Sequence, residues 1–337
     1  MFLKRSRKRW LKMVKVGILG QGIYLPSKKL TNFDLEKIVE TSDEWIRTRT
    51  GIKERRIAAV HEKTSDMASK AALQALKNAK ISSEKIDLIV VATVTPDSSF
   101  PSVACKVQKA IGAKKAAAFD VSAACSGYLY ALTTAKQYIQ TGLAKRALVI
   151  AADRFSSLID WKDRDTCVLF GDGAGACVLG PVKSGGITAD FLQAFGDQGD
   201  LMQVIAEGAR GPFNLGKVTA KLPYVVMNGQ GLFKVAVNSM ADAIEKVLKK
   251  AKIKKEDIDC IVPHQANDRI ISAVAKKLNV PKEKIFINID KYGNMSAASI
   301  AVALYEAQKS KKIKKGDNVV LVVFGAGLVS AANVIKW

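Results

Sequence analysis

Histidine is scarce in this sequence, because the 337 residues include only His61 and His264. Any imidazole chemistry must therefore use one of these two side chains. His61 lies in a polar stretch before a predicted helix, and we interpret it as an exposed loop residue. His264 follows an apolar run that ends at Pro263, and the carboxyl end of a strand is where α/β folds commonly place functional groups. The sequence therefore favours His264 as the candidate imidazole.

Cysteine is also infrequent, and no two cysteines have a C-x-x-C spacing. Because that spacing is typical of metal sites and redox dithiols, its absence means that we expect neither. An odd number of cysteines without an export signal is typical of reduced thiols in the cytoplasm. The five cysteines are Cys105, Cys125, Cys167, Cys177 and Cys260.

Long apolar runs are missing as well. The runs Ile86–Thr95, Ala147–Ala152 and Val319–Phe324 have the length of strands. None approaches the roughly 20 apolar residues that a membrane helix needs. The basic amino terminus is not followed by the apolar stretch and small-residue cleavage site of a signal peptide. The sequence therefore predicts a cytoplasmic protein with no membrane partner.

Acidic residues are outnumbered, since 53 Lys and Arg face 31 Asp and Glu, for a formal net charge of +22. Six of the basic residues lie in residues 1–12, which contain no acidic residue, so the rest of the chain keeps an excess of +16. We interpret residues 1–12 as a disordered basic tail. The remaining excess favours acidic partners such as nucleic acid, anionic lipid, an acidic carrier protein or phosphorylated cofactors, and charge alone does not choose among them.

Short apolar runs alternate with amphipathic helical patterns along the chain, which predicts an α/β fold. The segment Ala79–Val90 is repeated at Ala251–Val262 with an offset of 172 residues, and other elements recur at nearly the same offset. This repeat predicts two similar halves, residues 13–183 and 215–337, related by a pseudo-dyad. A glycine-rich segment without clear periodicity, residues 184–214, is predicted to connect them and cover a substrate.

Cys125 lies where a predicted strand turns into a helix that begins near Gly127. The unsatisfied N–H groups and dipole at a helix amino end stabilise a thiolate, so this position predicts a lowered pKa for the thiol. The neighbouring residues are small and leave room for a substrate. The other cysteines lie within apolar segments and are interpreted as small hydrophobic residues.

The repeat connects Cys125 with two residues of the second half. The turn equivalent to that of Cys125 contains Asn294, and His264 ends the strand equivalent to Ile86–Thr93. If the pseudo-dyad brings the two helix amino ends together, the thiol, the imidazole and the amide meet at one place. Such a set is suited to acyl transfer. The glycine-rich turn around Ala326 could direct a backbone N–H at a developing oxyanion.

Six motifs after about Met13 stand out: Thr41-Ser42-Asp43-Glu44-Trp45-Ile46, Arg49-Thr50-Gly51-Ile52, Ala123-Ala124-Cys125-Ser126-Gly127, Phe170-Gly171-Asp172-Gly173-Ala174-Gly175-Ala176, Pro263-His264-Gln265-Ala266-Asn267 and Tyr292-Gly293-Asn294. With these motifs, the chain from about Met13 onward resembles the β-ketoacyl-acyl carrier protein synthase III family, the initiating ketosynthases of bacterial type II fatty acid synthesis. The resemblance implies a thiolase-like fold, with two duplicated α/β halves in a layered αβαβα arrangement, and a homodimer.

The resemblance also implies roles for individual residues. Cys125 matches the acylated nucleophile. His264 and Asn294 match the pair that holds the malonyl thioester carbonyl and stabilises the enolate formed on loss of carbon dioxide. Further matches are the backbone N–H groups of Cys125 and Ala326 for the oxyanion hole; Trp45, Arg49, Arg164 and Asn267 for coenzyme A and its pantetheine arm; Phe100 for a residue that crosses the dimer interface and closes the acyl pocket; and Lys234, Arg269, Lys276 and Lys277 for the acidic carrier protein.

The implied reaction is the decarboxylative Claisen condensation of acetyl-CoA, or another short acyl-CoA, with malonyl-acyl carrier protein to give a 3-oxoacyl-acyl carrier protein. It needs no metal or redox cofactor. The sequence departs from the family pattern at Met295, where threonine is usual, and at Ala326, which stands within a usual run of three glycines. Ala326 keeps its N–H, but the acyl preference stays open.

Two other functions fit parts of the sequence. A chalcone-synthase-like polyketide ketosynthase shares the Cys-His-Asn set and uses CoA thioesters rather than a carrier protein, although the chain length and the Trp45 and Arg49 motif favour the initiating synthase. A nucleic-acid-binding protein would explain the net charge but would leave Cys125, His264 and Asn294 without a purpose. We therefore expect no nucleic-acid partner.

Overall fold

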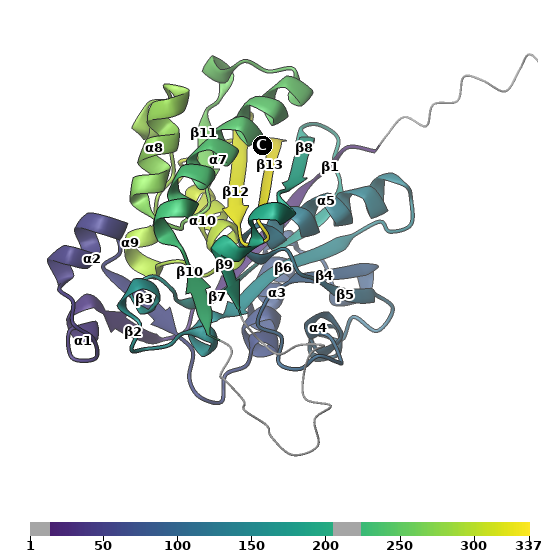
Figure 1. Ribbon diagram of the computed structural model, residues 1–337. Coiled ribbons are helices and arrows are strands. Elements are labelled where there is room, and N and C mark those ends of the chain that lie inside the picture. The colour runs from purple at the N-terminus through teal and green to yellow at the C-terminus, as the bar shows by residue number, and fades with distance from the viewer. Residues whose placement is uncertain (1–13, 205–223) are drawn as a thin grey trace, which may run out of the picture.

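The computed structural model describes residues 14–204 and 224–337, which form two mixed β-sheets flanked by helices (Figure 1). The strand order is β1-β7-β6-β4-β5 in the first sheet and β11-β12-β13-β8 in the second. The predicted α/β class is confirmed. The strands of the first sheet are β1 (Val16–Tyr24), β4 (Leu88–Ala92), β5 (Ala117–Val121), β6 (Ala147–Arg154) and β7 (Asp172–Pro181); those of the second are β8 (Gly186–Ala194), β11 (Cys260–Pro263), β12 (Asn318–Gly325) and β13 (Val329–Lys336).

The two sheets have the same topology. In the first, β1 and β6 both run antiparallel to β7, and β4 runs parallel to β6 and to β5. In the second, β8 and β12 both run antiparallel to β13, and β11 runs parallel to β12. A single parallel bridge between Ile261 and Ile285 stands where the first sheet has its fifth strand. The structure therefore shows the repeat that the offset of 172 residues predicted.

The segment 184–214 is more than a connection. Its residues 186–194 form β8, which pairs with β13 and occupies in the second sheet the place that β1 has in the first. The second repeat therefore begins near Gly186 and not at residue 215. Exposed and buried residues alternate irregularly along β8, so it lacks the continuous apolar run of the inner strands. Residues 205–223, and the predicted tail 1–12, lie outside the described residues.

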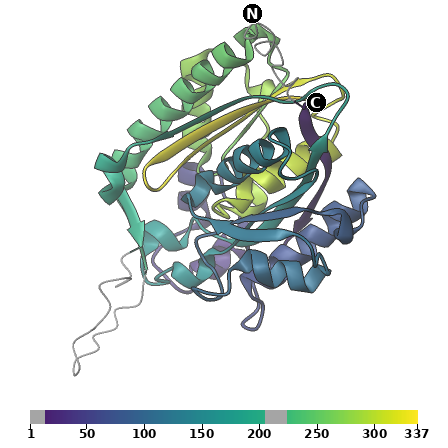
Figure 2. The ribbon, with the colours of Figure 1, turned by 90° about the vertical axis from the view of Figure 1, so that its right-hand side faces the viewer.

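The helices form three layers around the sheets, as Figure 2 shows. Between the sheets lie α5 (Gly127–Gln140) and α10 (Ala298–Lys309). The outer face of the first sheet packs on α3 (Thr64–Ala79) and α4 (Val103–Ile111), and that of the second on α7 (Gly229–Ala251) and α8 (Asp268–Leu278). Along β4, Val90 and Ala92 face the central helices. Ile89 and Val91 face the outer ones, because side chains alternate along a strand.

A small lobe beside the sheets carries Trp45. Its helix α2 (Asp43–Thr50) begins after Ser42, whose side chain accepts a hydrogen bond from the Trp45 N–H, and ends at Gly51, where φ is +80°. Buried Arg55 ties the lobe to the segment between α6 (Arg164–Cys167) and β7, since its Nη2 donates to the Val168 carbonyl at 2.6 Å. The remaining short elements are β2 (Lys28–Thr31), α1 (Asn32–Leu35), β3 (Glu54–Ile57), α6 (Arg164–Cys167), β9 (Met202–Val204), β10 (Val225–Met227) and α9 (Ile289–Tyr292).

Within the described part of the chain, no helix has both the length and the apolar character that crossing a membrane requires.

Candidate active site

Cys125 lies in the turn that joins β5 to α5, two residues before the helix begins. The turn holds Ala124 in the left-handed region, with φ at +44°. Gly127 has no room for a side chain, because a Cβ there would lie 2.9 Å from the Cβ of Ala92. The sharp turn and the close packing leave Cys125 only 3% exposed, at the centre of the molecule.

Asn294 lies in the matching turn of the second half. This turn holds Ser296 in the left-handed region, with φ at +51°, just before α10. The side-chain Oδ1 of Asn294 accepts a hydrogen bond from the Ser296 N–H at 2.9 Å. The backbone of Asn294 donates to the Leu169 carbonyl at 2.9 Å and accepts from the Gly171 N–H at 3.0 Å. These bonds hold the Asn294 side chain in place, and its Nδ2 donates to no acceptor among the described residues.

His264 follows β11, where its backbone N–H donates to the Val322 carbonyl at 2.8 Å. The side chain is buried, and within the described residues neither ring nitrogen has a hydrogen-bond partner. Burial lowers the pKa of His264 to about 3. The ring is therefore neutral near pH 7, with one nitrogen able to donate and the other able to accept.

Cys125, His264 and Asn294 line one cavity of about 130 Å³. The three side chains that the sequence pattern picked out therefore meet at one place. A second hollow, of about 200 Å³, also borders Cys125 and extends past Ser296 and Ala326. Its wall is mostly apolar, with contributions from Val94, Phe155, Met202 and Val225. Both spaces have mostly apolar walls, and the first adds the imidazole of His264 and the amide of Asn294 beside the thiol.

The turn after β12 packs directly on Cys125. A Cβ added to Gly325 would lie 2.9 Å from the Cβ of Cys125 and 3.0 Å from its backbone nitrogen. Only glycine allows such an approach. Ala326, the next residue, borders the same hollow as Cys125. The backbone of this turn therefore lies close to the place where an oxyanion would form on an acyl group held by Cys125.

The thiol of Cys125 lacks the lowered pKa that its position near a helix amino end predicted. Burial raises the pKa of Cys125 to about 12; hydrogen bonding by Ser296 lowers it, and the charge of Asp153 raises it further. None of the described side chains that act on this pKa is a cation. Desolvation of the thiolate therefore outweighs the helix end, and attack by the sulfur requires a base for its proton.

A wider cleft of about 660 Å³ adjoins the inner cavity and shares several wall residues with it, among them Leu169, Met227 and Asn267. Trp45, Arg49 and Arg269 line its outer part. The guanidinium carbons of Arg49 and Arg164 lie 4.6 and 5.0 Å from the centre of the Trp45 ring. An aromatic ring between two cations, beside a passage to a buried thiol, suits a ligand with a flat base, phosphates and a long narrow arm.

Comparison with known proteins identifies the family. The sequence matches the models for 3-Oxoacyl-[acyl-carrier-protein (ACP)] synthase III over residues 119–196 and for its C-terminal part over residues 248–337. The beta-ketoacyl-[acyl-carrier-protein] synthase III of Caldanaerobacter subterraneus subsp. tengcongensis is 54% identical over 325 residues, which cover 96% of this chain and 98% of the relative. The chain belongs to the β-ketoacyl-[acyl-carrier-protein] synthase III family.

Other members of the family agree over nearly the whole chain. The synthase III of Clostridioides difficile is 55% identical over 323 residues, covering 96% of this chain and 98% of the relative. The crystal structure of the synthase III from Aquifex aeolicus has a TM-score of 0.90 at 50% identity and covers 96% of this chain and 100% of its own. The predicted thiolase-like fold is therefore confirmed, and the chain is a condensing acyltransferase.

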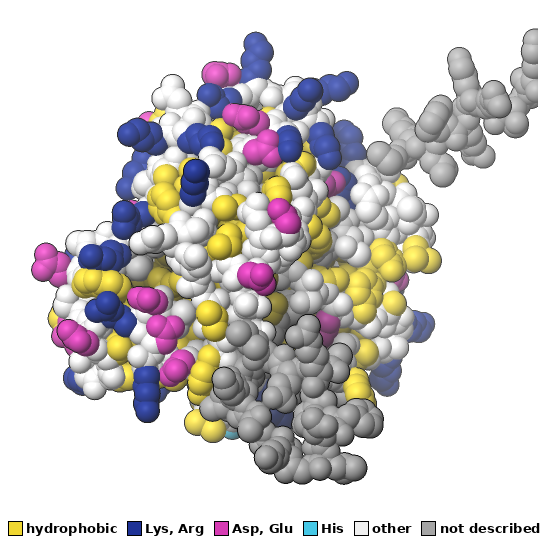
Figure 3. All heavy atoms as spheres, viewed as in Figure 1, with side chains coloured by type: hydrophobic (Ala, Val, Ile, Leu, Met, Phe, Trp, Pro, Cys, Tyr) yellow, Lys and Arg dark blue, Asp and Glu magenta, His cyan; other side chains and the backbone are white. Residues whose placement is uncertain are grey.

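The remaining predicted residues lie away from the synthase's inner cavity. Phe100 is 86% exposed in the single chain and lines neither the inner cavity nor the apolar hollow. Lys234, Arg269, Lys276 and Lys277 are exposed on α7 and α8. Figure 3 shows basic side chains gathered over these two helices. The site roles of all these residues stay predictions.

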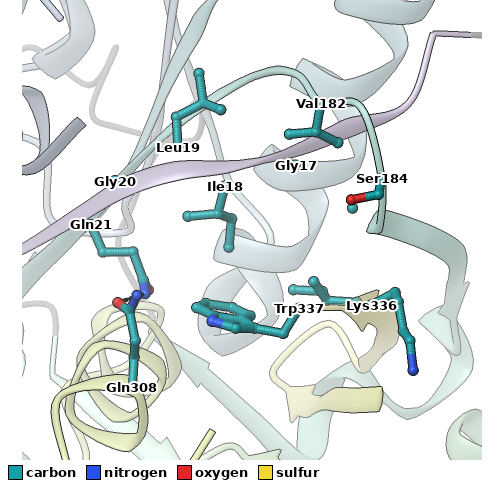
Figure 4. A pocket seen from close by; sticks show the side chains of 12 residues that line it. Gly17, Ile18, Leu19, Gly20, Gln21, Val182, Ser184, Gln308, Lys336 and Trp337 are labelled. Atoms are coloured by element: carbon teal, nitrogen blue, oxygen red, sulfur yellow. Dashed lines mark hydrogen bonds between the residues drawn. The ribbon is translucent and has the colours of Figure 1, made fainter. Parts of the chain in front are cut away.

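The sequence interpretation missed two buried polar residues next to Cys125. Ser296 borders the apolar hollow, and Asp153 is buried at the end of β6. Asp153 could have been found, because it ends an apolar strand just as His264 does. A separate cavity of about 140 Å³ lies between β1 and the carboxyl end of the chain, beside Gln21, Gln308 and Trp337 (Figure 4). It borders none of the predicted site residues.

Proposed function

We propose that this synthase transfers a short acyl group from coenzyme A to Cys125 and condenses it with malonyl-acyl carrier protein. The product is a 3-oxoacyl-acyl carrier protein, which initiates type II fatty acid synthesis. The observation that carries the proposal is the single cavity that unites Cys125, His264 and Asn294 at the end of a cleft lined by Trp45. Relatives at about half identity are named beta-ketoacyl-[acyl-carrier-protein] synthase III, which supports the proposal.

The first stage is acylation. The sulfur of Cys125 attacks the carbonyl carbon of the acyl-CoA, the bond to the coenzyme A sulfur breaks, and coenzyme A leaves. Negative charge develops on the carbonyl oxygen, and the backbone N–H groups of Cys125 and Ala326 are the proposed donors. One such donor contributes about 10²–10³ in rate. The acyl chain then lies in the apolar hollow beside Val94 and Phe155.

The second stage is decarboxylation and condensation. Neutral His264 donates one hydrogen bond to the malonyl thioester carbonyl, and the Nδ2 group of Asn294 donates another. Loss of carbon dioxide leaves an enolate whose charge falls on the oxygen that these donors hold. The enolate carbon attacks the acyl carbon on Cys125, the bond from that carbon to the sulfur breaks, and the released thiolate takes up a proton from solvent at the cleft. Protein groups handle each developing charge, so the proposed chemistry uses no metal or redox cofactor.

The same proposal assigns binding roles to residues of the cleft entrance and the outer surface. Trp45, Arg49 and Arg164 bind the base and phosphates of coenzyme A, and Asn267 contacts the pantetheine arm. The exposed basic side chains of α7 and α8 attract the acidic carrier protein, since opposite surface charges speed association. We further propose that the enzyme works in the cytoplasm as a homodimer, in which Phe100 of each chain closes the acyl pocket of its partner.

Mass spectrometry of the intact protein tests the proposal. After incubation with acetyl-CoA, the wild type should gain one acetyl group that peptide mapping places on Cys125. The variant Cys125→Ala should gain none, while Cys105→Ala, which removes an exposed thiol, should be labelled like the wild type. Addition of malonyl-acyl carrier protein should discharge the label as a 3-oxoacyl product. A label on a different residue would overturn the assignment.

A further inference from the structure

Asp153 is a buried carboxylate beside the nucleophile that the proposed reaction does not use. It has no solvent exposure. Its Oδ1 accepts three hydrogen bonds, from the Thr93 hydroxyl at 3.0 Å, the Val94 N–H at 2.8 Å and the Thr95 hydroxyl at 3.1 Å. Its Oδ2 accepts none from the described residues. Oδ1 therefore anchors the segment after β4, whereas Oδ2 is available to accept a hydrogen bond or a proton.

The hydroxyl of Ser296 lies close to both Asp153 and Cys125, and Ser296 and Cys125 border the same hollow. Hydrogen bonding from Ser296 lowers the pKa of both groups, so one hydroxyl is beside both. Neither contact reaches full hydrogen-bond geometry, since the Ser296 oxygen and Oδ2 of Asp153 are both unpaired among the described residues. The left-handed turn and the bond from the Ser296 N–H to Asn294 fix the position of this side chain. The hydroxyl proton of Ser296 therefore has two nearby acceptors, the sulfur of Cys125 and Oδ2 of Asp153.

The surroundings of Asp153 argue against a purely structural ion pair. Arg154, its neighbour in the chain, turns away and donates to the Val60 carbonyl. Residues 93–95, which pack on the carboxylate, contribute hydroxyls and a backbone N–H. The titratable group that shares Ser296 with Asp153 is Cys125, and His264 borders that thiol in the other cavity, which Ser296 does not line. A buried carboxylate without a cation is costly, so its retention calls for a functional reason.

We propose that Ser296 and Asp153 form a proton relay that receives the thiol proton of Cys125 when the sulfur attacks the acyl donor. The thiol proton passes to Oγ of Ser296 while the hydroxyl proton of Ser296 passes to Oδ2 of Asp153. The sulfur of Cys125 bonds to the acyl carbon, and the bond from that carbon to the coenzyme A sulfur breaks. The reverse relay, or solvent at the cleft, returns a proton to the departing thiolate. In this relay Ser296 exchanges a proton with the reacting sulfur directly, and Asp153 acts through Ser296.

The two candidate bases near Cys125 differ in their suitability. The pKa of His264, lowered to about 3, leaves the ring a poor proton acceptor near neutral pH. Burial raises the pKa of Asp153 to about 6, against the hydrogen bonds that lower it. A base is most effective when its pKa is near the working pH. The inference rests on the proposed function, because it supplies the base that acylation of a protonated thiol requires.

The pH dependence of Cys125 reactivity tests the relay. Two rates are measured from pH 5 to 10: release of coenzyme A from acetyl-CoA without the malonyl substrate, and alkylation of Cys125 by iodoacetamide. In the wild type both should rise through about pH 6 and then level off, as Asp153 becomes able to accept a proton. In Ser296→Ala and Asp153→Asn the rates at pH 7 should fall by about 10²-fold, and the rise should continue with pH instead of levelling off.

Two matched variants separate the relay from general packing. Ser69→Ala removes a buried hydroxyl that donates to its own helix, and Asp172→Asn neutralises a buried carboxylate that accepts hydrogen bonds from the Ala58 and Ser156 backbones. Both should keep the levelling near pH 6. If Ser296→Ala has the same pH–rate profiles as the wild type, the relay is overturned. The relay is also overturned if the rates of Ser296→Ala fall equally at every pH, so that the shape of the profile is retained. Should Asp153→Asn fail to fold, Ser296→Ala alone decides. If Cys125 of the wild type is alkylated by iodoacetamide but not acetylated by acetyl-CoA, the proposed function is refuted. The pH dependence of alkylation then decides on the relay by itself.

Discussion

The two turns that meet at the centre of the molecule share a backbone and differ in chemistry. Ala124 and Ser296 are 172 residues apart, both have positive φ, and each precedes a central helix. One residue further on, the first turn has Cys125 and the second has Ala297. The strand β4 ends at Ala92, whereas 172 residues later the chain places His264 after β11. Cys125 and His264 therefore each have an alanine as counterpart in the other half.

This asymmetry indicates a division of labour between the halves. In the proposed reaction, the first half supplies the sulfur that holds the acyl group, and the second half supplies the imidazole and the amide that polarise a carbonyl. The close contact between Gly127 and Ala92, with Ala297 beside it, explains why the inert positions carry alanine, since a larger side chain would separate the halves. If this comparison is right, variants on the two sides should affect different stages of the reaction.

The largest expected effect comes from Cys125→Ala. Condensation should fall by about 10⁴-fold or more, since no other group can hold the acyl chain. Release of carbon dioxide from malonyl-acyl carrier protein should persist, because His264 and Asn294 are untouched. A radiometric assay for carbon dioxide, run beside the condensation assay, measures both. Loss of decarboxylation together with condensation would show that the two halves do not work separately.

The converse variant is His264→Ala. Decarboxylation should fall by about 10²–10³-fold, since a donor to the enolate oxygen is lost. Acylation of Cys125 by acetyl-CoA should stay near the wild-type rate, because in the proposed mechanism the imidazole holds the second substrate. Rapid-quench mass spectrometry of the acyl-enzyme separates the stages. Asn294→Ala serves as a second test, with its melting temperature recorded because Oδ1 of Asn294 also anchors the turn at Ser296. Equal losses in both stages would contradict the division.

Much of this comparison could be predicted from the sequence. The repeat is evident from residues that recur with an offset of 172 in the sequence. The strand-to-helix patterns around Cys125 and Asn294 place both residues on equivalent turns. His264 was identified because only two histidines exist and one follows a buried strand. Local pattern was sufficient in these cases, because strand ends and helix starts in α/β repeats fall at one edge of the sheet.

Other features depend on tertiary surroundings that no local pattern encodes. The strand β8 lacks a continuous apolar run, so its pairing with β13 could not be foreseen. The raised pKa of Cys125 follows from burial on all sides, which only the assembled layers produce. Ser296 and Asp153 are far apart in the sequence, and their approach to Cys125 depends on how the two halves pack.

A smaller effect, on stability, is expected where the halves touch. In Gly127→Ala, the new Cβ would lie 2.9 Å from the Cβ of Ala92 and 3.5 Å from that of Ala297, so the turns must separate. The free energy of unfolding should fall by about 1–3 kcal/mol, as for other overpacked cores. Urea unfolding followed by circular dichroism measures it. Gly196→Ala is the matched control, because a Cβ at Gly196 meets no atom within 4 Å. Equal stability of the two variants would mean that the contact is not tight.

The smallest expected effect lies at the cleft entrance, which both stages share. In Trp45→Ala, the ring that Arg49 and Arg164 flank is lost, and with it about 0.5–2 kcal/mol of interaction with a stacked base. The KM for acetyl-CoA should rise by about 3–30-fold with little change in kcat, because the ring binds a part of the substrate that does not react. Phe33→Ala, which removes an exposed aromatic ring from the same lobe, should leave both constants unchanged. A fall in kcat with an unaltered KM would instead show that Trp45 affects the chemical step. The cleft entrance and the inner cavity would then act as one functional unit.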